Sequence, residues 1–203
     1  ENLIDPVVMA AATVMRLQTI DSREVSAAEA AIITVGSLQA GSMENIIPDE
    51  AVLKINIRTY NREVRERVLG AVHRIVNAEA AAGGAEVPPE ITTINHFAMV
   101  QNDPTSTKRL ATAFRKHFSA ADVQHSVPTK MSDDFGEFSD ASGIPAIYWF
   151  IGSTPPELYH SMVQENRLAE LPANHNPRFL PILAPTLSLG IQTLAVAALE
   201  WLS

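Results

Sequence analysis

The chain has 203 residues, of which 46% are hydrophobic and 19% charged, and its formal net charge is −8. This length allows one large domain or two small ones, and the composition is that of a folded globular protein rather than a disordered one. The 15 Lys and Arg residues form no cluster, so binding to nucleic acid is not expected. The absence of cysteine excludes disulfides, thiolate metal ligands and cysteine nucleophiles within this chain.

The first predicted element is a helix. Asp5 is a favourable N-cap residue, and Pro6 follows at the first helical position, where proline is well tolerated. An apolar stripe at helical spacing is expected to face the core: Val8, Ala11, Ala12, Met15 and Ile20. The chain starts almost at this cap, without an initiating Met or a signal-peptide pattern, so we expect that sequence is missing upstream.

Two strands and a second helix follow. A strand is expected at about 30–38, then a turn-rich segment at 39–49. Alternating apolar and polar residues at 51–58 indicate a strand with one covered face. Asn61 then caps a long helix that Gly83 and Gly84 end, and a short strand is expected at 86–94. This α-β-β-α-β order is the ferredoxin-like unit without its first strand, which is central in that topology.

Residues 96–203 have a different pattern. Helices are expected at 104–117, 132–140 and 179–202, with a long polar loop at 152–177. The continuous apolar run 144–151 is typical of a strand buried on both faces. The apolar stretch near the C-terminus is interrupted by Pro185, Gly190 and polar residues, which favours a buried helix over a membrane span. We therefore expect an α/β protein with a ferredoxin-like domain at 1–95 and the end of an α/β domain at 96–203.

The histidines form no local metal-binding pair, and the sequence contains neither HExxH nor GxSxG. His175 ends the polar loop just before the last helix. It is either a solvated loop residue or a metal ligand, because neutral imidazole on a loop beside an α/β core commonly binds metal. His160, in the same loop, competes with it for that role.

Two further groups of residues could carry chemistry. Asp133 and Asp134 are consecutive, so on a helix their carboxylates would diverge; one could cap the helix while the other faces a site, or both could simply stabilise its N-terminus. Arg58 lies on the polar face of the second strand, and Asn45 precedes that strand. A guanidinium and an amide together suit a carboxylate ligand, although an ordinary charged surface explains them equally well.

Several segments together resemble the M20 metallopeptidases, most closely the branch with hippurate hydrolases and N-acyl amino-acid hydrolases. The most specific is 41–49, Gly-Ser-Met-Glu-Asn-Ile-Ile-Pro-Asp, followed by Ile57-Arg58-Thr59-Tyr60. The other matching segments are Asp5-Pro6-Val7, 17–20, 22–25, 131–135 (Met-Ser-Asp-Asp-Phe), Gly143-Ile144-Pro145 and 175–179 (His-Asn-Pro-Arg-Phe).

The resemblance implies a two-domain enzyme with two bridged divalent metals, zinc, manganese or nickel, and a lid domain that mediates homodimerisation. Residues 1–95 would be most of the lid, and 96–203 the C-terminal segment of the catalytic domain. His175 would be a metal ligand, and Asn45 and Arg58 would hold the carboxylate of an N-acyl amino acid, often across the dimer. Asp133 and Asp134 match a Glu-Asp pair near the active site, with Asp133 replacing the usual Glu.

The resemblance also marks what this chain lacks. The other metal ligands and the glutamate general base of the family lie upstream of the lid, so this chain alone is expected to be inactive. The segment 154–172 looks expanded and could alter substrate access. The absence of a signal favours the cytoplasm and nothing suggests membrane binding. A non-catalytic dimerisation or binding module is the main alternative, while a serine hydrolase using His160 or His175 lacks an elbow motif.

Overall fold

The computed structural model describes residues 3–129, 131 and 133–202. The chain divides into two compact units, one of Glu1–Met99 with Pro128–Ser132, the other of Val100–Val127 with Asp133–Ser203. Each unit is described below by itself. Among the described residues, no helix is both long enough and apolar enough to cross a membrane.

Unit 1 begins with helix α1, Pro6–Thr19, as predicted. The Asp5 side chain accepts hydrogen bonds from the backbone N–H groups of Val7 and Val8. The helix continues into a single π-helical segment, Ile20–Glu24, labelled η1.

The predicted apolar stripe was confirmed at Ile20, which is fully buried, and was wrong at Val8, Ala11 and Met15. Val8 and Met15 are 63% and 72% exposed, and Ala11 is exposed as well. Besides Ile20, the buried residues of the helix are Ala10, Thr13 and Leu17. Because α1 is apolar on most sides, its spacing alone does not select a face. Packing against the rest of the unit selects the face that carries the larger Leu17 and Ile20.

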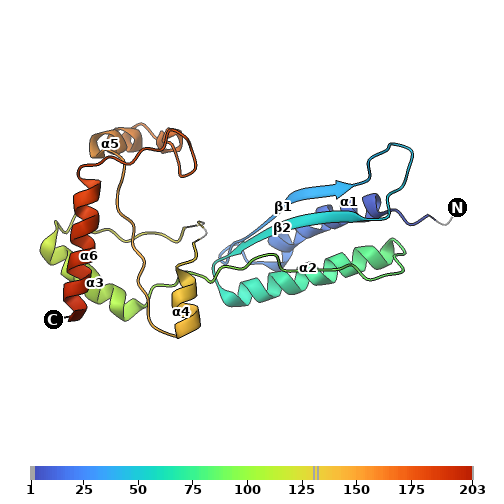
Figure 1. Ribbon diagram of the computed structural model, residues 1–203, viewed down its shortest axis with the longest axis horizontal. Helices are drawn as coiled ribbons and strands as arrows, with labels where there is room; N and C mark the ends of the chain where they lie inside the picture. Colours follow the sequence, from blue (N-terminus) through green and yellow to red (C-terminus); the bar gives the residue numbers. More distant parts are fainter. Residues whose placement is uncertain (1–2, 130, 132, 203) are drawn as a thin grey trace. The chain divides into compact units, whose positions relative to one another are not determined.

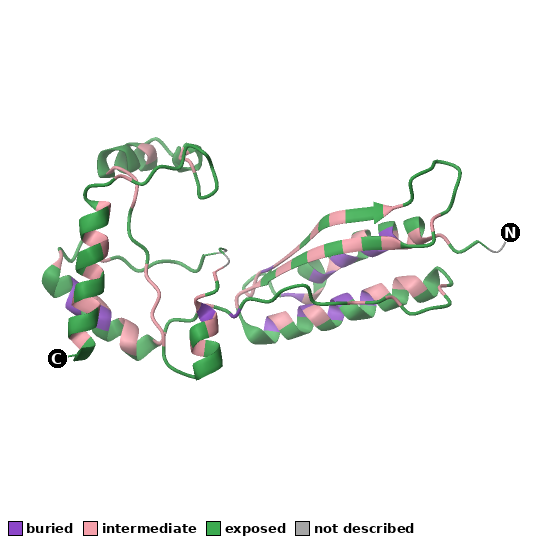
Figure 2. Ribbon diagram, viewed as in Figure 1, coloured by how far each residue is buried: buried purple, intermediate pink, exposed green. Residues whose placement is uncertain are grey.

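Strands β1, Ala31–Ala40, and β2, Ala51–Thr59, form an antiparallel hairpin (Figure 1). The register runs from Ala31 opposite Thr59 to Ala40 opposite Ala51, with an irregularity beside Gly36. Exposure alternates along β2, as the period of two predicts (Figure 2). One face of this sheet therefore packs inward, and the other is open to solvent.

Helix α2, Arg62–Ala82, completes unit 1. Its N-cap is Asn61, as expected: the Asn61 side chain accepts the Val64 N–H at 2.7 Å. The helix ends at Gly83, and Gly84 follows in the left-handed region with φ +76°. A Cβ at Gly83 would lie 2.3 Å from Met9, so a side chain there would clash with α1.

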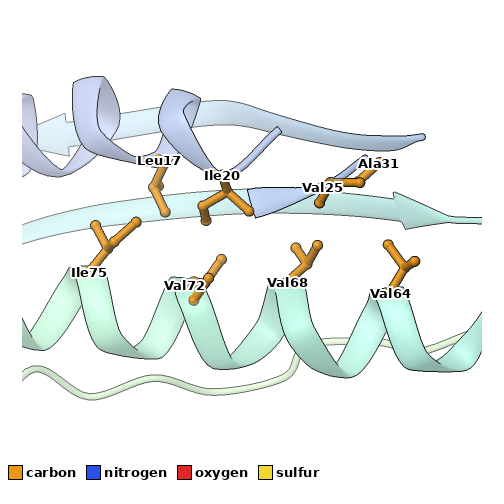
Figure 3. Packing of buried hydrophobic residues seen from close by; sticks show 9 residues of the cluster. Leu17, Ile20, Val25, Ala31, Val64, Val68, Val72 and Ile75 are labelled. Atoms are coloured by element: carbon orange, nitrogen blue, oxygen red, sulfur yellow. The ribbon is translucent and has the colours of Figure 1, made fainter. Parts of the chain in front are cut away.

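The core of unit 1 lies between the two helices and the hairpin, and Figure 3 shows it from close by. Leu17, Ile20, Val64 and Val68 are fully buried. Burying a side chain of this size stabilises the fold by about 1.5–3 kcal/mol. Helix α2 contributes Val64, Val68, Ala71, Val72 and Ile75 to this core, with Val76 partly buried at the edge of the cluster.

The strand expected at 86–94 was wrong, since this segment has no regular structure. In the ferredoxin-like topology the last strand pairs only with the first, and α1 is here the first element that the structure describes. An extended segment without a hydrogen-bonded neighbour is not a strand.

Unit 2 is helical in the part of the chain that the structure describes. Its helices are α3, Pro104–His117, α4, Gly136–Ser142, α5, Pro156–Gln164, and α6, Thr186–Leu202, with a 3₁₀ turn η2 at Leu168–Glu170. Leu110, Ala113 and Phe114 of α3 are buried. Helix α3 is held to α6 by an ion pair from Arg109 to Glu200, 2.8 Å, and Arg109 also stacks on the ring of Trp201.

Three expectations for unit 2 were wrong. The run 144–151 is not a strand buried on both faces: it is extended, and Ile144 and Phe150 are 66% and 49% exposed. The loop expected at 152–177 contains α5 and η2. The last helix starts at Thr186 rather than near 179, after Pro185. The helix expected at 132–140 appears as α4; its expected first residue, Ser132, lies outside the described residues.

Candidate active site

Arg58 stands near the end of β2, on the exposed face of the sheet and opposite Ile32 of β1. Asn56 lies two residues before it and therefore on the same face. The Arg58 Nε–H donates a hydrogen bond to Asn56 Oδ1 at 3.2 Å. This contact orients the guanidinium on an open surface, where a planar fork of N–H donors can pair with a carboxylate.

Asn45 lies in the loop that joins the two strands, and it is exposed. Figure 1 shows this loop projecting beyond the end of the hairpin. Arg58 is seven residues into β2 from Ala51, and a strand rises about 3.3 Å per residue, so about 23 Å of strand separates Arg58 from the loop. The hairpin thus does not bring Asn45 and Arg58 together within one chain.

His175 is exposed, and its backbone is left-handed with φ +70°. Such a conformation is uncommon outside glycine and persists only where neighbouring contacts support it. Asn176 supplies them: its N–H donates to the Ala173 carbonyl at 3.0 Å, and its side-chain oxygen accepts the Arg178 N–H at 2.9 Å. The competing His160 lies instead on helix α5, beside the ring of Tyr159.

A metal needs more ligands than this arrangement supplies. Among residues 3–129, 131 and 133–202, no group of three or more His, Asp or Glu side chains lies close enough to hold a metal ion. The exposed imidazole of His175 suits a divalent metal as one ligand of several. Further ligands would have to come from outside the described residues.

The two adjacent aspartates have different surroundings. Asp133 is half-buried, and its Oδ1 accepts the Phe135 N–H at 2.8 Å, while its Oδ2 accepts the Tyr148 hydroxyl at 3.3 Å. Asp134 is exposed, and its carbonyl accepts the Glu137 N–H as α4 begins. Burial, followed by the negative charge and hydrogen bond of Asp133, raises the pKa of Tyr148 above its ordinary value.

Sequence patterns missed the contacts that organise unit 2. Asn102 pairs with the backbone of Tyr148 through two hydrogen bonds, at 2.7 and 2.8 Å, which no local spacing predicts. A second cluster could have been recognised in the sequence. In it, Arg167 forms ion pairs with both Glu165 and Glu170, at 2.7 and 2.8 Å. The Glu-x-Arg-x-x-Glu spacing of charges could have indicated it.

Comparison with known proteins shows which protein family this chain is similar to. Residues 1–84 match the model of the peptidase dimerisation domain of the M20 family. The chain is 32% identical over 148 residues to N-acetyldiaminopimelate deacetylase of Limosilactobacillus fermentum, covering 73% of this chain and 38% of that protein. It is 28% identical over 159 residues to N-acetylcysteine deacetylase of Bacillus subtilis, covering 78% and 40%.

Solved structures agree on the fold. The YXEP protein of Bacillus subtilis, described as a dinuclear metal binding peptidase of the M20 family, superposes with a TM-score of 0.71 at 24% identity, over 96% of this chain and 46% of that one. A protein of methicillin resistant Staphylococcus aureus described as an aminohydrolase gives 0.76 at 20% identity, over 98% and 47%. The α/β fold class is therefore confirmed.

The chain spans about 40% of the length of the curated relatives it matches. The dimerisation-domain match lies within unit 1, and the aligned relatives and structures extend well beyond it into the rest of the chain. Taken with the sequence segments around Asn45, Arg58 and His175, these likenesses lead to one conclusion: residues 1–84 form a peptidase dimerisation domain of the M20 family, and the chain as a whole is similar to part of the M20 peptidases and deacetylases.

Proposed function

We propose that the chain is the lid and the C-terminal catalytic segment of a metal-dependent amidohydrolase that acts on N-acyl amino acids. The observation that carries this is Arg58, whose guanidinium is oriented by Asn56 on the open face of a sheet in the region matched by the dimerisation domain. The relatives are named for N-acetylcysteine and N-acetyldiaminopimelate, both N-acetylated amino acids. A free carboxylate of such a substrate is the natural partner of Arg58.

Positioning is the chemical task of unit 1. Arg58 would bind the substrate carboxylate and so place the amide bond at the reacting centre; holding a substrate in a reactive geometry is a large part of catalysis. His175 would hold one of two divalent metals, zinc, manganese or nickel. Bound metals in hydrolases of this kind supply Lewis acidity and an activated water. The general base would come from the rest of the protein.

The metal role of His175 is tested by metal analysis of the native gene product. His175→Ala should lose about one metal per chain and reduce amide hydrolysis by at least about 100-fold, because a ligand is removed. His160→Ala is the matched control, since His160 is also exposed and lies in the same segment of unit 2. Full metal content in His175→Ala, or equal losses in both variants, would contradict the assignment.

The position of Asn45 supports the proposal that the protein acts as a homodimer. About 23 Å of strand lies between Ala51 and Arg58, and Asn45 lies in the loop before Ala51, so we expect the two side chains of one chain to be too far apart to contact one small carboxylate. We therefore propose that Asn45 of one protomer completes the carboxylate site of Arg58 in its partner. An isologous dimer would form two such sites.

Mixing two inactive variants tests this arrangement. Asn45→Ala and Arg58→Ala should each raise KM strongly when pure. Unfolding and refolding them together makes about half of the dimers mixed, each with one intact site of two, so about one quarter of wild-type activity should return. If both residues served the same protomer's site, a mixed dimer would have no intact site and activity would stay low.

The alternative function is a non-catalytic dimerisation or binding module. It is favoured by the two-stranded sheet of unit 1, whose strands each have one edge without a neighbouring strand in the described part of the chain. Metal analysis separates the two functions, because a pure binding module needs no metal at His175. The domain boundary at residue 95 and the cytoplasmic localisation stay predictions.

A further inference from the structure

Tyr148 connects three segments of unit 2. Its N–H donates to Asn102 Oδ1 at 2.7 Å, and its carbonyl accepts from Asn102 Nδ2 at 2.8 Å, so its backbone is held on both sides. Its ring packs edge-to-face against Phe135 at 5.2 Å and Phe150 at 5.3 Å between centroids. With backbone and ring both fixed, the direction of the hydroxyl is fixed as well.

The hydroxyl donates to Asp133 Oδ2 at 3.3 Å, while Asp133 Oδ1 accepts the Phe135 N–H at 2.8 Å. Both oxygens of this carboxylate are therefore engaged within the unit. The contact from Asp133 to the amide two residues on is an Asx-turn, which the short side chain of Asp or Asn makes. A Glu is one methylene longer and does not form this turn.

The raised pKa of Tyr148 agrees with this arrangement, since burial and the neighbouring carboxylate keep the phenol protonated and able to donate at neutral pH. The next residue, Asp134, has an exposed side chain. In this pair of acids, one is thus anchored to the protein and the other is accessible to solvent.

We propose that Tyr148 is a positioning residue: through its hydrogen bond to Asp133 it fixes the turn at 133–135, so that Asp133 is an anchor and Asp134 is the carboxylate presented to the reacting centre. This inference rests on the proposed amidohydrolase function. It gives a physical reason for Asp at 133, because only the shorter acid bonds both the Phe135 amide and the Tyr148 hydroxyl.

Steady-state kinetics of the native gene product with its metal, on an N-acetyl amino acid, test the role. Tyr148→Phe removes only the hydroxyl, and Asp133→Asn removes the charge. Each should lower kcat about tenfold with little change in KM, because the carboxylate is misplaced rather than substrate binding lost. The double variant should be no worse than either single one, since both remove the same contact. Tyr159→Phe, an exposed tyrosine of α5, should be unchanged.

Phenol titration by ultraviolet absorbance gives a second readout, which tests directly whether the contact between Tyr148 and Asp133 exists in solution. Subtracting the curve of Tyr148→Phe from the wild-type curve isolates Tyr148. In Asp133→Asn the pKa of Tyr148 should fall toward its ordinary value, because the carboxylate no longer opposes the phenolate. An unchanged titration, or additive kinetic losses in the double variant, would overturn the inference.

The outcomes separate the two proposals. An active wild type with unchanged Tyr148→Phe kinetics would overturn this inference and leave the amidohydrolase function standing. A metal-loaded wild type that hydrolyses no N-acyl amino acid would overturn the proposed function and this role together. Circular dichroism of each variant confirms that a loss of kcat is not a loss of fold.

Discussion

The two units differ in how their elements find partners. In unit 1, consecutive elements pack on one another: the hairpin strands are adjacent in sequence, and α1 and α2 flank them and bury a common core. In unit 2, α6 has no buried residue among those described, and Leu187, Leu194 and Leu202 are 57%, 62% and 84% exposed. Elements with local partners complete their packing, whereas apolar segments that need distant partners remain open.

The largest expected contrast is a truncation in each unit. Leu17→Ala removes a fully buried side chain of unit 1 and should lower the free energy of unfolding by about 2–5 kcal/mol. Leu194→Ala, the matched change on α6, should cost little because the side chain is 62% exposed. Urea unfolding of the chain measures both changes. Equal losses would show that the two units do not differ in packing.

Helix caps sharpen the comparison at a smaller scale. Asn61 caps α2 in unit 1, and Asp103 caps α3 in unit 2, each with a 2.7 Å bond from a backbone N–H. Asn61→Ala should destabilise unit 1 by about 1 kcal/mol. Amide hydrogen exchange should show faster opening of α2 and leave α3 unchanged. Spread of the effect to α3 would mean that the units unfold together.

The same two caps should differ in their pH dependence. The backbone N–H of Ser106 holds the pKa of Asp103 below its ordinary value. A lowered folded-state pKa means that the carboxylate stabilises α3 above the unfolded pKa of about 3.9, and this stability is lost as pH falls through the folded value. Asn61 does not titrate. Below about pH 4, the α3 amides should therefore lose protection against exchange as Asp103 becomes protonated. The α2 amides should not lose protection for this reason, because their cap carries no titrating group.

The smallest expected effect concerns the charge cluster of α5 and η2. Arg167 lowers the pKa of Glu170 through a direct hydrogen bond. The pKa of Glu165 is lowered mainly by a hydrogen bond from Ser161 and, to a smaller extent, by one from Arg167. All three groups are at the surface, so Arg167→Ala should leave global stability almost unchanged. Limited proteolysis within 156–172 should become faster, whereas Arg115→Ala on α3 should not alter it. Unchanged cleavage would show that the cluster does not order this segment.

Prediction from sequence succeeded where the cause is local. The caps at Asp5 and Asn61, the alternation along β2 and the end of α2 at Gly83 each depend on residues within a few positions. The family segments identified Asn45, Arg58 and His175 as candidates, and their roles stay predictions. The run at 144–151 was misassigned because a strand requires neighbours that its own residues do not specify.

By itself, the sequence determined the order of α1, β1, β2 and α2 and the positions of their caps, and its recognisable segments indicated the M20 resemblance, because these follow from short-range periodicity, capping and short motifs. Tertiary structure alone decided which face of α1 is buried, that Asn102 holds the backbone of Tyr148, and that Asp133 is bound while Asp134 is exposed. Those features depend on contacts between residues far apart in the chain, and a contact of that kind has no signature in local spacing.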